Sequence, residues 1–417
     1  MSLAAPVAAR IGELVDRRTE AGRPYFEAEA GRLAELCHRM AERFARGGRL
    51  LALGASPQAR SDARHVAVEF VHPVIVGKRA LPARAVAGEG SELVSRLDLV
   101  AEPEDIVIGF GLDENGGGDS KALASARARG CLTIAFAGDP GAEWVFEPPS
   151  GDGFVRQELA ETLYHVLWEL VHVFFEHRGL LEGRDAAPIH DTGASSFLYP
   201  FLGERETGLE DVVEDVRRSV LAKAEDVGAL REQTLGEGAD ELLAAAAALR
   251  ARLDAGGTLL ALGNGGSATD ATDVVADFRA APRSGPPGSE GWPARRALDL
   301  TDDPGILTAI ANDIGAEAIF ARQVIAYGRP GDAVIALSTS GNSANLIAAL
   351  AEARRRGLLT IAMVGYDGGR IAAERLADHV IVTRSEHLPR IQEAQASAYH
   401  ALRELVETGG SGAETAR

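Results

Sequence analysis

The sequence predicts an α/β protein with two doubly wound parallel sheets in tandem, each forming an α-β-α sandwich. Short apolar strand patterns alternate with helical patterns along the chain, which is typical of parallel sheets covered by helices on both faces. The same order of patterns occurs twice. The length of 417 residues agrees with more than one domain, because a domain has roughly 100 to 200 residues.

The first half begins with helical patterns. Residues 8–46 are predicted to form two helices, of which the second, residues 28–44, carries an apolar stripe. The elements expected after them are strands at 49–54, near Val74, at 105–110 and at 131–136, helices ending at Phe70 and spanning 120–129, and a closing helix at 155–177.

The second half repeats this order. Its expected elements are helices at 209–233 and 239–254, strands at Leu259, Ala297, Val334, Thr360 and Val380, and a closing helix at 390–406. The letters match as well: GGRLLALGAS near residue 50 corresponds to GGTLLALGNG near residue 260, and QELAETLYH at 157–165 corresponds to QEAQASAYH at 392–400. We interpret this as an internal duplication, with domains at 1–178 and 207–417 and a linker at 179–206.

Composition limits the classes of partner. The net charge of −18 argues against direct binding of nucleic acid, which needs a basic face. Cys37 and Cys131 lie in apolar patterns, so we expect no disulfide framework and a reducing compartment. The first residues lack a basic region followed by an apolar run, and no window has 18 uninterrupted apolar residues. We therefore expect no leader, no membrane partner and a cytoplasmic location.

Two stretches predict a binding site for an anion. Residues 257–278 and 333–350 each read as an apolar strand, a loop of Gly, Ser, Thr and Asn, and a helix. Such a loop lets the backbone approach a ligand, and the free N–H groups of the following helix favour phosphate. The second loop places four hydroxyls within six residues and has no P-loop lysine, which favours the monophosphate of a sugar over ATP. The alternative is that these residues serve only as turns and helix caps.

Several motifs resemble one family. GNGGS ending at Ser267, AIANDIG at 309–315, STSGNSANLI from Ser338, VGYDGG at 364–369 and RIQE at 390–393 resemble the phosphoheptose isomerases of the sugar isomerase (SIS) domain superfamily, which act on sedoheptulose 7-phosphate. The first half resembles the family through its duplication of the second. The resemblance implies two tandem SIS domains, of which the first is degenerate. It also implies phosphate contacts from Asn264, Gly265, Gly266, Ser267, Ser338, Thr339, Ser340, Asn342 and Ser343, and further substrate contacts from Asp313 and Gln392.

The resemblance also implies an acid–base pair and a candidate metal site. The family's catalytic Glu and His correspond to Asp277 and His400 in the second half and to Glu69 and His165 in the first. Some family members bind zinc, so zinc is a candidate cofactor here. The implied ligands are His65, Glu69, Gln157 and His165, which is the complete family set; the second half offers the weaker set of Asp273, Asp277, Gln392 and His400.

The first half has lost the phosphate loops. The loop corresponding to STSGNS carries Asp113 and Glu114, and carboxylates repel phosphate. Because family members assemble as tetramers, we expect a homodimer that forms a pseudo-tetramer, with a composite site that combines phosphate loops from one half and the Glu69 and His165 set from the other.

The predicted reaction is the interconversion of an aldose and a ketose phosphate through an enediol. It needs a base for the carbon-bound proton and an acid for the developing oxyanion, roles that a carboxylate and an imidazole can fill. Two alternatives stay open: a non-catalytic SIS sensor or protein-interaction module, and a phosphosugar isomerase or transferase with a smaller substrate. His165 and His400 could also be hydrogen-bonded core histidines.

Overall fold

The computed structural model describes residues 4–54, 56–74, 78–88, 90–111, 120–136, 141–176, 208–280, 286 and 288–409. These fall into two compact units. Unit 1 takes residues 1–20, 150–158 and 226–417, and unit 2 takes residues 21–149 and 159–225. Three helices contribute residues to both units: α1 (Ala4–Ala45), α5 (Gly153–Glu176) and α6 (Leu209–Glu237). The division into domains at 1–178 and 207–417 stays a prediction, and the expected linker at 179–206 lies outside the described residues.

Unit 2 is built on a parallel sheet with the strand order β2-β1-β3-β4-β5. Its strands are β1 (Leu50–Gly54), β2 (Ala83–Val86), β3 (Ile106–Phe110), β4 (Leu132–Ala135) and β5 (Trp144–Val145), and its helices include α2 (Pro57–Val71), α3 (Gly90–Val100) and α4 (Ser120–Ala128). Leu50 pairs with Ala83 on one side and with Ile106 on the other. Every residue of β1 and β3 is buried, as expected for central strands covered on both faces.

Unit 1 has a second parallel sheet with the order β10-β9-β8-β6-β7. Its strands are β6 (Leu259–Gly263), β7 (Ala297–Asp299), β8 (Ala333–Ser338), β9 (Leu359–Gly365) and β10 (His379–Thr383). Its helices include α7 (Ala239–Asp254), α8 (Gly266–Arg279), α9 (Pro304–Asp313), α10 (Ile319–Tyr327), α11 (Ala344–Arg355), α12 (Gly369–Ala373) and α13 (Leu388–Thr408). Read from the other edge, this order is the same as in unit 2, which supports the interpretation as a duplication.

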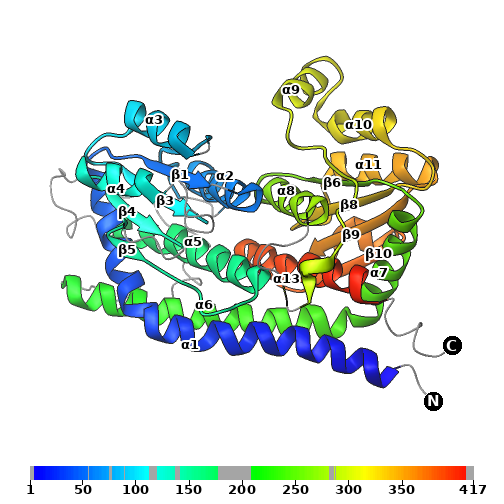
Figure 1. Ribbon diagram of the computed structural model, residues 1–417, viewed down its shortest axis with the longest axis horizontal. Coiled ribbons are helices and arrows are strands. Elements are labelled where there is room, and N and C mark those ends of the chain that lie inside the picture. Colours follow the sequence, from blue (N-terminus) through cyan, green and yellow to red (C-terminus); the bar gives the residue numbers. More distant parts are fainter. Residues whose placement is uncertain are drawn as a thin grey trace. The chain divides into compact units, whose positions relative to one another are not determined.

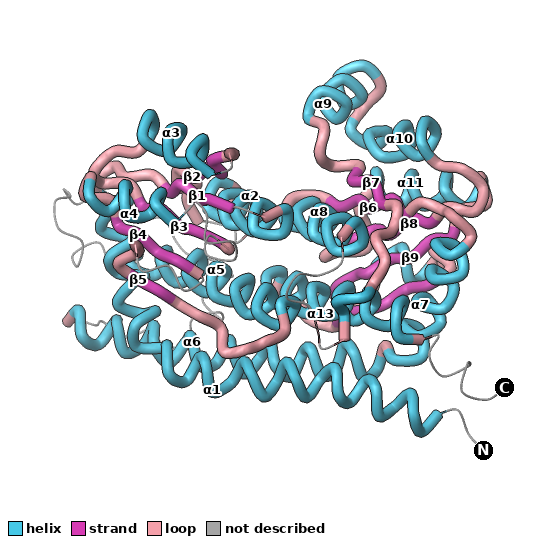
Figure 2. Tube along the Cα trace, in the orientation of Figure 1, coloured by secondary structure: helices cyan, strands magenta, loops and turns pink. Residues whose placement is uncertain are grey.

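Helices cover both faces of the unit 1 sheet, as Figures 1 and 2 show. Side chains alternate between the faces of a strand, so Leu259 and Leu260 enter different cores. Leu259 packs in a cluster that includes α7, α8 and α13. Leu260 packs in another that includes α10 and α11. The doubly wound parallel fold expected from the sequence is confirmed.

Two expected elements differ from the structure. The two helices predicted over residues 8–46 form the single helix α1, with Pro24 inside it. Proline removes one backbone hydrogen bond, but apolar side chains on both sides of it, such as Leu14 and Phe26, are buried, and this burial offsets the loss. The strand expected near Val74 is not found at that residue, and 75–77 lie outside the described residues. The second strand of the half is β2.

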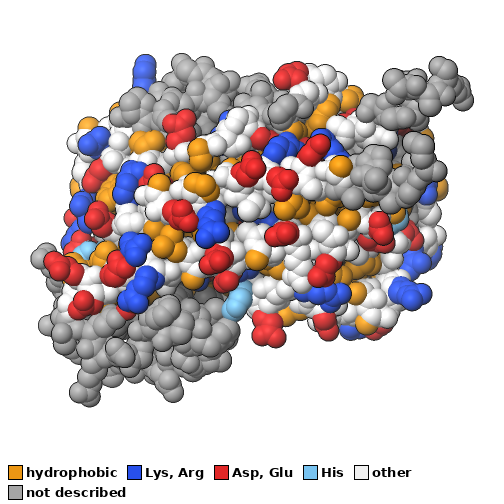
Figure 3. All heavy atoms as spheres, turned by 90° about the horizontal axis from the view of Figure 1, so that it is seen from below, with side chains coloured by type: hydrophobic (Ala, Val, Ile, Leu, Met, Phe, Trp, Pro, Cys, Tyr) orange, Lys and Arg blue, Asp and Glu red, His pale blue; other side chains and the backbone are white. Residues whose placement is uncertain are grey.

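Acidic and basic side chains are interspersed on the face drawn in Figure 3 and do not form a continuous basic stripe there. Among the described residues, no helix is long and apolar enough to cross a membrane.

Candidate functional site

The two predicted loops of unit 1 lie next to each other. The GNGGS loop follows β6 and the STSGNS loop follows β8, and these two strands pair in parallel. Ligands of open parallel sheets bind at the carboxyl ends of the strands. At Gly263 a Cβ atom would lie 2.1 Å from the backbone oxygen of Ser267, so only glycine permits this close strand-to-helix turn.

The STSGNS loop is held by its own hydrogen bonds. The Ser338 hydroxyl accepts a bond from the N–H of Gly341 at 3.1 Å. The side-chain amide of Asn342 donates to the backbone oxygen of Ser340 at 2.9 Å and accepts from the N–H of Arg370 at 2.9 Å. Ser338 and Asn342 therefore brace the loop through these groups, in addition to any contact that they make with a ligand.

The VGYDGG turn supports this loop from outside. Gly341 has a φ of +63°, and a Cβ there would lie 2.2 Å from the backbone oxygen of Gly368. The N–H of Ile371 donates to the oxygen of Gly341 at 3.1 Å. From the other side, the side chain of Gln395 on α13 donates to the oxygen of Ser338 at 3.1 Å. The sequence did not identify Gln395, because nothing in its local pattern marks it as a loop support.

Other groups of the loop stay available for a ligand. Ser343 is the N-cap of α11, and among the described residues its side chain makes no capping hydrogen bond. Thr339 and Ser340 are half-buried beside it. The first N–H groups of a helix attract anions. The loop and the start of α11 can therefore present neutral donors to one phosphate.

The predicted acid–base pair of unit 1 is brought together. Asp277 on α8 and His400 on α13 are both buried, and Asp277 Oδ2 lies 3.4 Å from His400 Nε2. The other ring nitrogen, Nδ1, lies 2.9 Å from Glu158 Oε1 on α5. Burial lowers the pKa of His400, but the neighbouring carboxylates of Asp277 and Glu158 outweigh burial and raise the pKa to about 9. His400 is therefore an imidazolium ion at neutral pH.

Glu158 is itself held in a buried ionic cluster. Arg18 Nε lies 3.0 Å from each of its carboxylate oxygens, Ser397 donates to Oε2, and Arg231 Nε lies 3.9 Å away. Burial raises the pKa of Glu158, but Arg18, His400 and Arg231 outweigh it and hold the pKa well below the usual value. The sequence did not single out Glu158, because its partners are spread over the chain.

The acid–base pair lies far along α8 from the loops. Ser267 is in the first turn of α8 and Asp277 is near its end. Ten residues of α-helix span about 15 Å. The loop and the pair thus occupy different ends of this helix.

Unit 2 contains a second buried cluster of expected residues. Nε2 of His65 lies 3.4 Å from Nε2 of His165 and 3.8 Å from Oε1 of Glu69. Ligand atoms of His65, Glu161 and His165 all lie within 4.8 Å of one another, and the three residues are buried. Glu161 was not predicted. Its position four residues before His165, one turn away on the same helix face, could have indicated it.

This cluster fits a divalent metal such as zinc. Burial, followed by the neighbouring His165, lowers the pKa of His65 well below its ordinary value, so the ring is neutral and keeps a lone pair. Nδ1 of His65 lies 3.0 Å from the Tyr164 hydroxyl, a second contact that orients a metal-binding imidazole. Two imidazoles and a carboxylate are typical of zinc sites.

The remaining expected site residues are dispersed. Asp313 is exposed at the end of α9, where it accepts a bond from Asn312 at 2.8 Å. Asp273 and Gln392 are buried on α8 and α13. Gln157 is half-buried on α5, one turn before Glu161. Asp113 and Glu114 lie outside the described residues.

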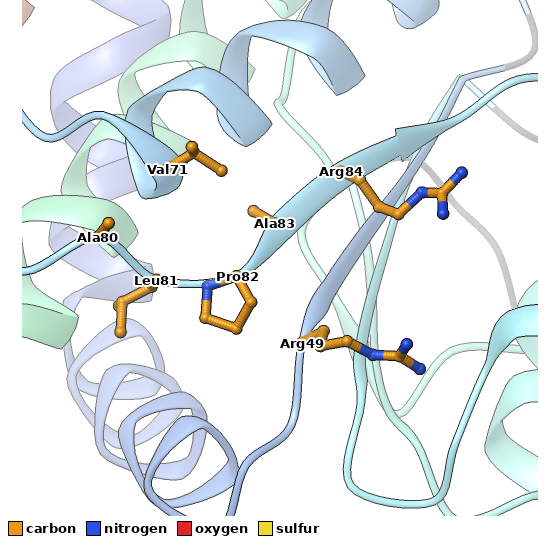
Figure 4. Close-up of a pocket in the computed structure, with 7 residues that line it drawn as sticks. All are labelled: Arg49, Val71, Ala80, Leu81, Pro82, Ala83 and Arg84. Atoms are coloured by element: carbon orange, nitrogen blue, oxygen red, sulfur yellow. The ribbon is translucent and has the colours of Figure 1, made fainter.

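A hollow of about 390 Å³ in unit 2 is a poor match to the expected site (Figure 4). Arg49 directly precedes β1 and Ala83 begins β2, so the hollow lies at the amino ends of these strands. Its lining residues are Arg49, Val71, Ala80, Leu81, Pro82, Ala83 and Arg84. Arg49 is already paired with Asp105 at 2.7 Å. The expected ligand edge is the opposite one.

Comparisons with known proteins define the class of this chain. Residues 224–365 match the SIS domain model. The chain resembles the C-terminal domain of glucosamine-fructose-6-phosphate aminotransferase from Francisella tularensis, with a TM-score of 0.59, 11% identity and 95% of each chain covered. It also resembles the tagatose-6-phosphate ketose/aldose isomerase of Escherichia coli, with a TM-score of 0.54, 14% identity and 98% of this chain and 94% of that chain covered. These similarities show the fold, that of two tandem SIS domains.

Sequence relatives define the family. The phosphoheptose isomerase of Chlorobaculum tepidum is 43% identical over 179 residues, which cover 43% of this chain and 83% of the relative. The phosphoheptose isomerase of Desulfovibrio desulfuricans is 42% identical over 188 residues, covering 45% and 86%. The chain belongs to the phosphoheptose isomerase family. The resemblance seen in the motifs is confirmed, and with it the expectation of an isomerase enzyme.

Proposed function

We propose that the protein interconverts a ketose phosphate and an aldose phosphate, with sedoheptulose 7-phosphate as the first substrate to test. The observation that carries this proposal is the loop after β8. The Thr339 and Ser343 hydroxyls and the first N–H groups of α11 are neutral donors suited to a sugar phosphate. The 43% identical relative is named for phosphoheptose isomerisation.

The acid–base chemistry has two candidate pairs. In unit 1, His400 carries a proton at neutral pH and Asp277 lies beside it, so the imidazolium would protonate the developing oxyanion and the carboxylate would take the carbon-bound proton. In unit 2, Glu69 lies beside His65, close to His165. Because Asp277 lies about 15 Å along α8 from the phosphate loop, both pairs need to be tested.

We also propose zinc as a ligand of the cluster in unit 2. His65, Glu161 and His165 would hold the ion, with Glu69 beside them. Glu161 joins the expected ligands, because its ligand atom lies within reach of both imidazoles. A bound zinc ion would act as a Lewis acid that polarises a carbonyl oxygen.

We also propose that the protein forms a homodimer and is located in the cytoplasm. Helix α9 has an apolar sequence but no buried residue, and Ile314 at its end is 57% exposed, which supports α9 as a surface for a second copy. Cys37 and Cys131 are free and buried, as expected in a reducing compartment.

The test is a proton-exchange assay with sedoheptulose 7-phosphate in deuterated water, with and without zinc. We expect exchange in the wild type and a loss of roughly 100-fold in whichever of Asp277→Asn and Glu69→Gln removes the base. Ser343→Ala is expected to raise KM, because it removes a phosphate donor. Stabilisation by the sugar phosphate without exchange would contradict the isomerase and favour the non-catalytic sensor.

A further inference from the structure

A pair of asparagines joins the two phosphate loops of unit 1. The side chain of Asn264, in the loop after β6, donates to Oδ1 of Asn345 at 3.0 Å. The side chain of Asn345, the second residue of α11, donates back to Oδ1 of Asn264 at 2.9 Å. These two bonds connect loops that are 81 positions apart in the sequence.

The arrangement uses each amide as both donor and acceptor. Oδ1 of Asn345 also accepts from the N–H of Leu346 at 3.0 Å, which ties its side chain to the first turn of α11. Asn264 is followed by Gly265, whose φ is +59° and whose missing Cβ would meet no atom within 4 Å. The loop after β6 thus has a flexible, open residue at this point, and the paired amide restrains it.

We propose that Asn345 is a positioning residue of the phosphate site, which it builds by clamping the loop after β6 against the start of α11. The clamp sets the spacing between Ser267, at the start of α8, and Ser343, at the start of α11. Donors from both loops can then converge on one phosphate. This inference rests on the proposed function, and it changes the role of Asn264 from a phosphate ligand to one half of the clamp.

The experiment is a double-mutant cycle with Asn264→Ala, Asn345→Ala and the double variant. Dissociation constants for sedoheptulose 7-phosphate and for inorganic phosphate would be measured by calorimetry. We expect each single variant to weaken binding about 10-fold and the double variant to be no weaker than either single variant, because both remove the same pair. If the two effects multiplied, or if Asn345→Ala bound as the wild type does, the clamp would be wrong.

Two further measurements separate positioning from general destabilisation. In steady-state kinetics, Asn345→Ala is expected to raise KM with kcat unchanged, because binding of the phosphate is lost equally in the ground and transition states. A matched control is Glu352→Gln, near the other end of α11, where Glu352 pairs with Arg355 and Arg356; it is expected to leave both constants unchanged. A fall in kcat with KM unchanged in Asn345→Ala would overturn the assignment.

Hydrogen exchange separates this inference from the proposed function. Without ligand, the N–H groups of residues 265–268 are expected to exchange faster in Asn345→Ala than in the wild type, because the clamp is open. Unchanged exchange there would overturn the clamp. If the wild type bound neither probe while exchange rose in the variant, the proposed function would be wrong; the asparagine pair would still restrain the loop, but it would not position a phosphate site.

Discussion

The two closing helices of the repeat place a histidine at the same position but in opposite electrostatic surroundings. In unit 1, His400 lies between the carboxylates of Asp277 and Glu158, and its pKa is raised to about 9. In unit 2, His165 faces the imidazole of His65 at 3.4 Å. Burial together with this neighbour lowers the pKa of His65. His400 therefore carries a proton at neutral pH, whereas the neutral ring of His65 has a lone pair available.

The comparison shows that burial alone does not decide the charge of a histidine. His65, His165 and His400 are all at most 1% exposed. Desolvation disfavours the charged forms of His65 and His400, but two carboxylates reverse the outcome for His400. The two units thus share the same strand order but differ in the charge around the corresponding histidines.

The largest expected effect is the loss of the buried carboxylate. Glu158→Gln leaves Arg18 buried without its main counterion and weakens the hold on His400, so we expect the free energy of unfolding in urea to fall by about 3 to 5 kcal/mol. The control is Glu374→Gln, whose ion pair with Arg370 is exposed and screened by water. Equal effects of the two substitutions would contradict a buried ionic cluster.

The pH should affect stability in opposite directions at the two sites: His400 should lose its stabilising effect as the pH rises, and His65 as the pH falls. The folded pKa of His400 is raised, so its contribution is complete below about pH 6.5 and is lost as the pH rises towards 9. At about 1.4 kcal/mol per pKa unit, the loss is roughly 3 kcal/mol. The free energy of unfolding in urea, measured from pH 6 to 10, should show this fall in the wild type and a shallower fall in His400→Gln. If the two profiles had the same slope, His400 would not be the charged group.

His65 should act on the acid side. Its folded pKa is lowered, so its contribution is present above the ordinary pKa and is lost as the pH falls below about 6.5. We expect His65→Gln to lose less stability than the wild type between pH 7 and 5. A wild-type profile identical to that of the variant over this range would mean that His65 stays accessible to protons.

Zinc should distinguish the two sites further. At a free concentration 100 times the dissociation constant, binding stabilises the folded state by about 2.7 kcal/mol, so we expect zinc to raise the Tm of the wild type and of Asp277→Asn. Glu161→Gln and His165→Ala should remove most of this rise, because they delete ligands from the cluster. A rise that persists in His165→Ala would place zinc elsewhere.

The smallest expected effect concerns the tyrosine beside the cluster. Tyr164→Phe removes the hydroxyl that lies 3.0 Å from Nδ1 of His65, and we expect zinc affinity to fall about 10-fold. Competition with a chromophoric chelator would measure this. Tyr399 occupies the matching position in the repeat, so Tyr399→Phe is the control and should leave zinc affinity unchanged.

Much of the fold could be predicted from the sequence. The strands at Leu259, Ala297, Val334, Thr360 and Val380 all lie where the sequence indicated. The central strands β6, β8 and β9 are buried along their whole length, because a central parallel strand is covered on both faces. The division of residues 8–46 into two helices was wrong, because the local pattern does not include the burial of the residues on either side of Pro24. Helices α9 and α10 were not predicted, although Asp303 caps α9 and Pro304 follows it as the first helical residue, which is a typical helix start.

The candidate site was predicted less completely. The resemblance to the family implied the pair of Asp277 and His400 and the set of His65, Glu69 and His165. The Gln, Tyr and His of the closing helices recur at the same spacing in both halves. Asn342 and Ser338 brace the loop through hydrogen bonds. These bonds could not be predicted from the residue types alone. Glu161 was missed because the ligands were chosen by correspondence with the family, and only the structure shows that its ligand atom lies near both imidazoles.

The sequence by itself determined which segments form strands and which loops carry small polar donors, because these follow from local periodicity and composition. The paired acids and histidines came from the resemblance to the family. Only the tertiary structure decided that Glu158 is hydrogen-bonded to His400, 242 positions away, that Arg18 is bonded to Glu158, and that Asn345 is hydrogen-bonded to Asn264. Contacts of this kind depend on which helices and loops pack together. The free energy of that packing comes from the whole core, so the sequence around either residue does not reveal the contact.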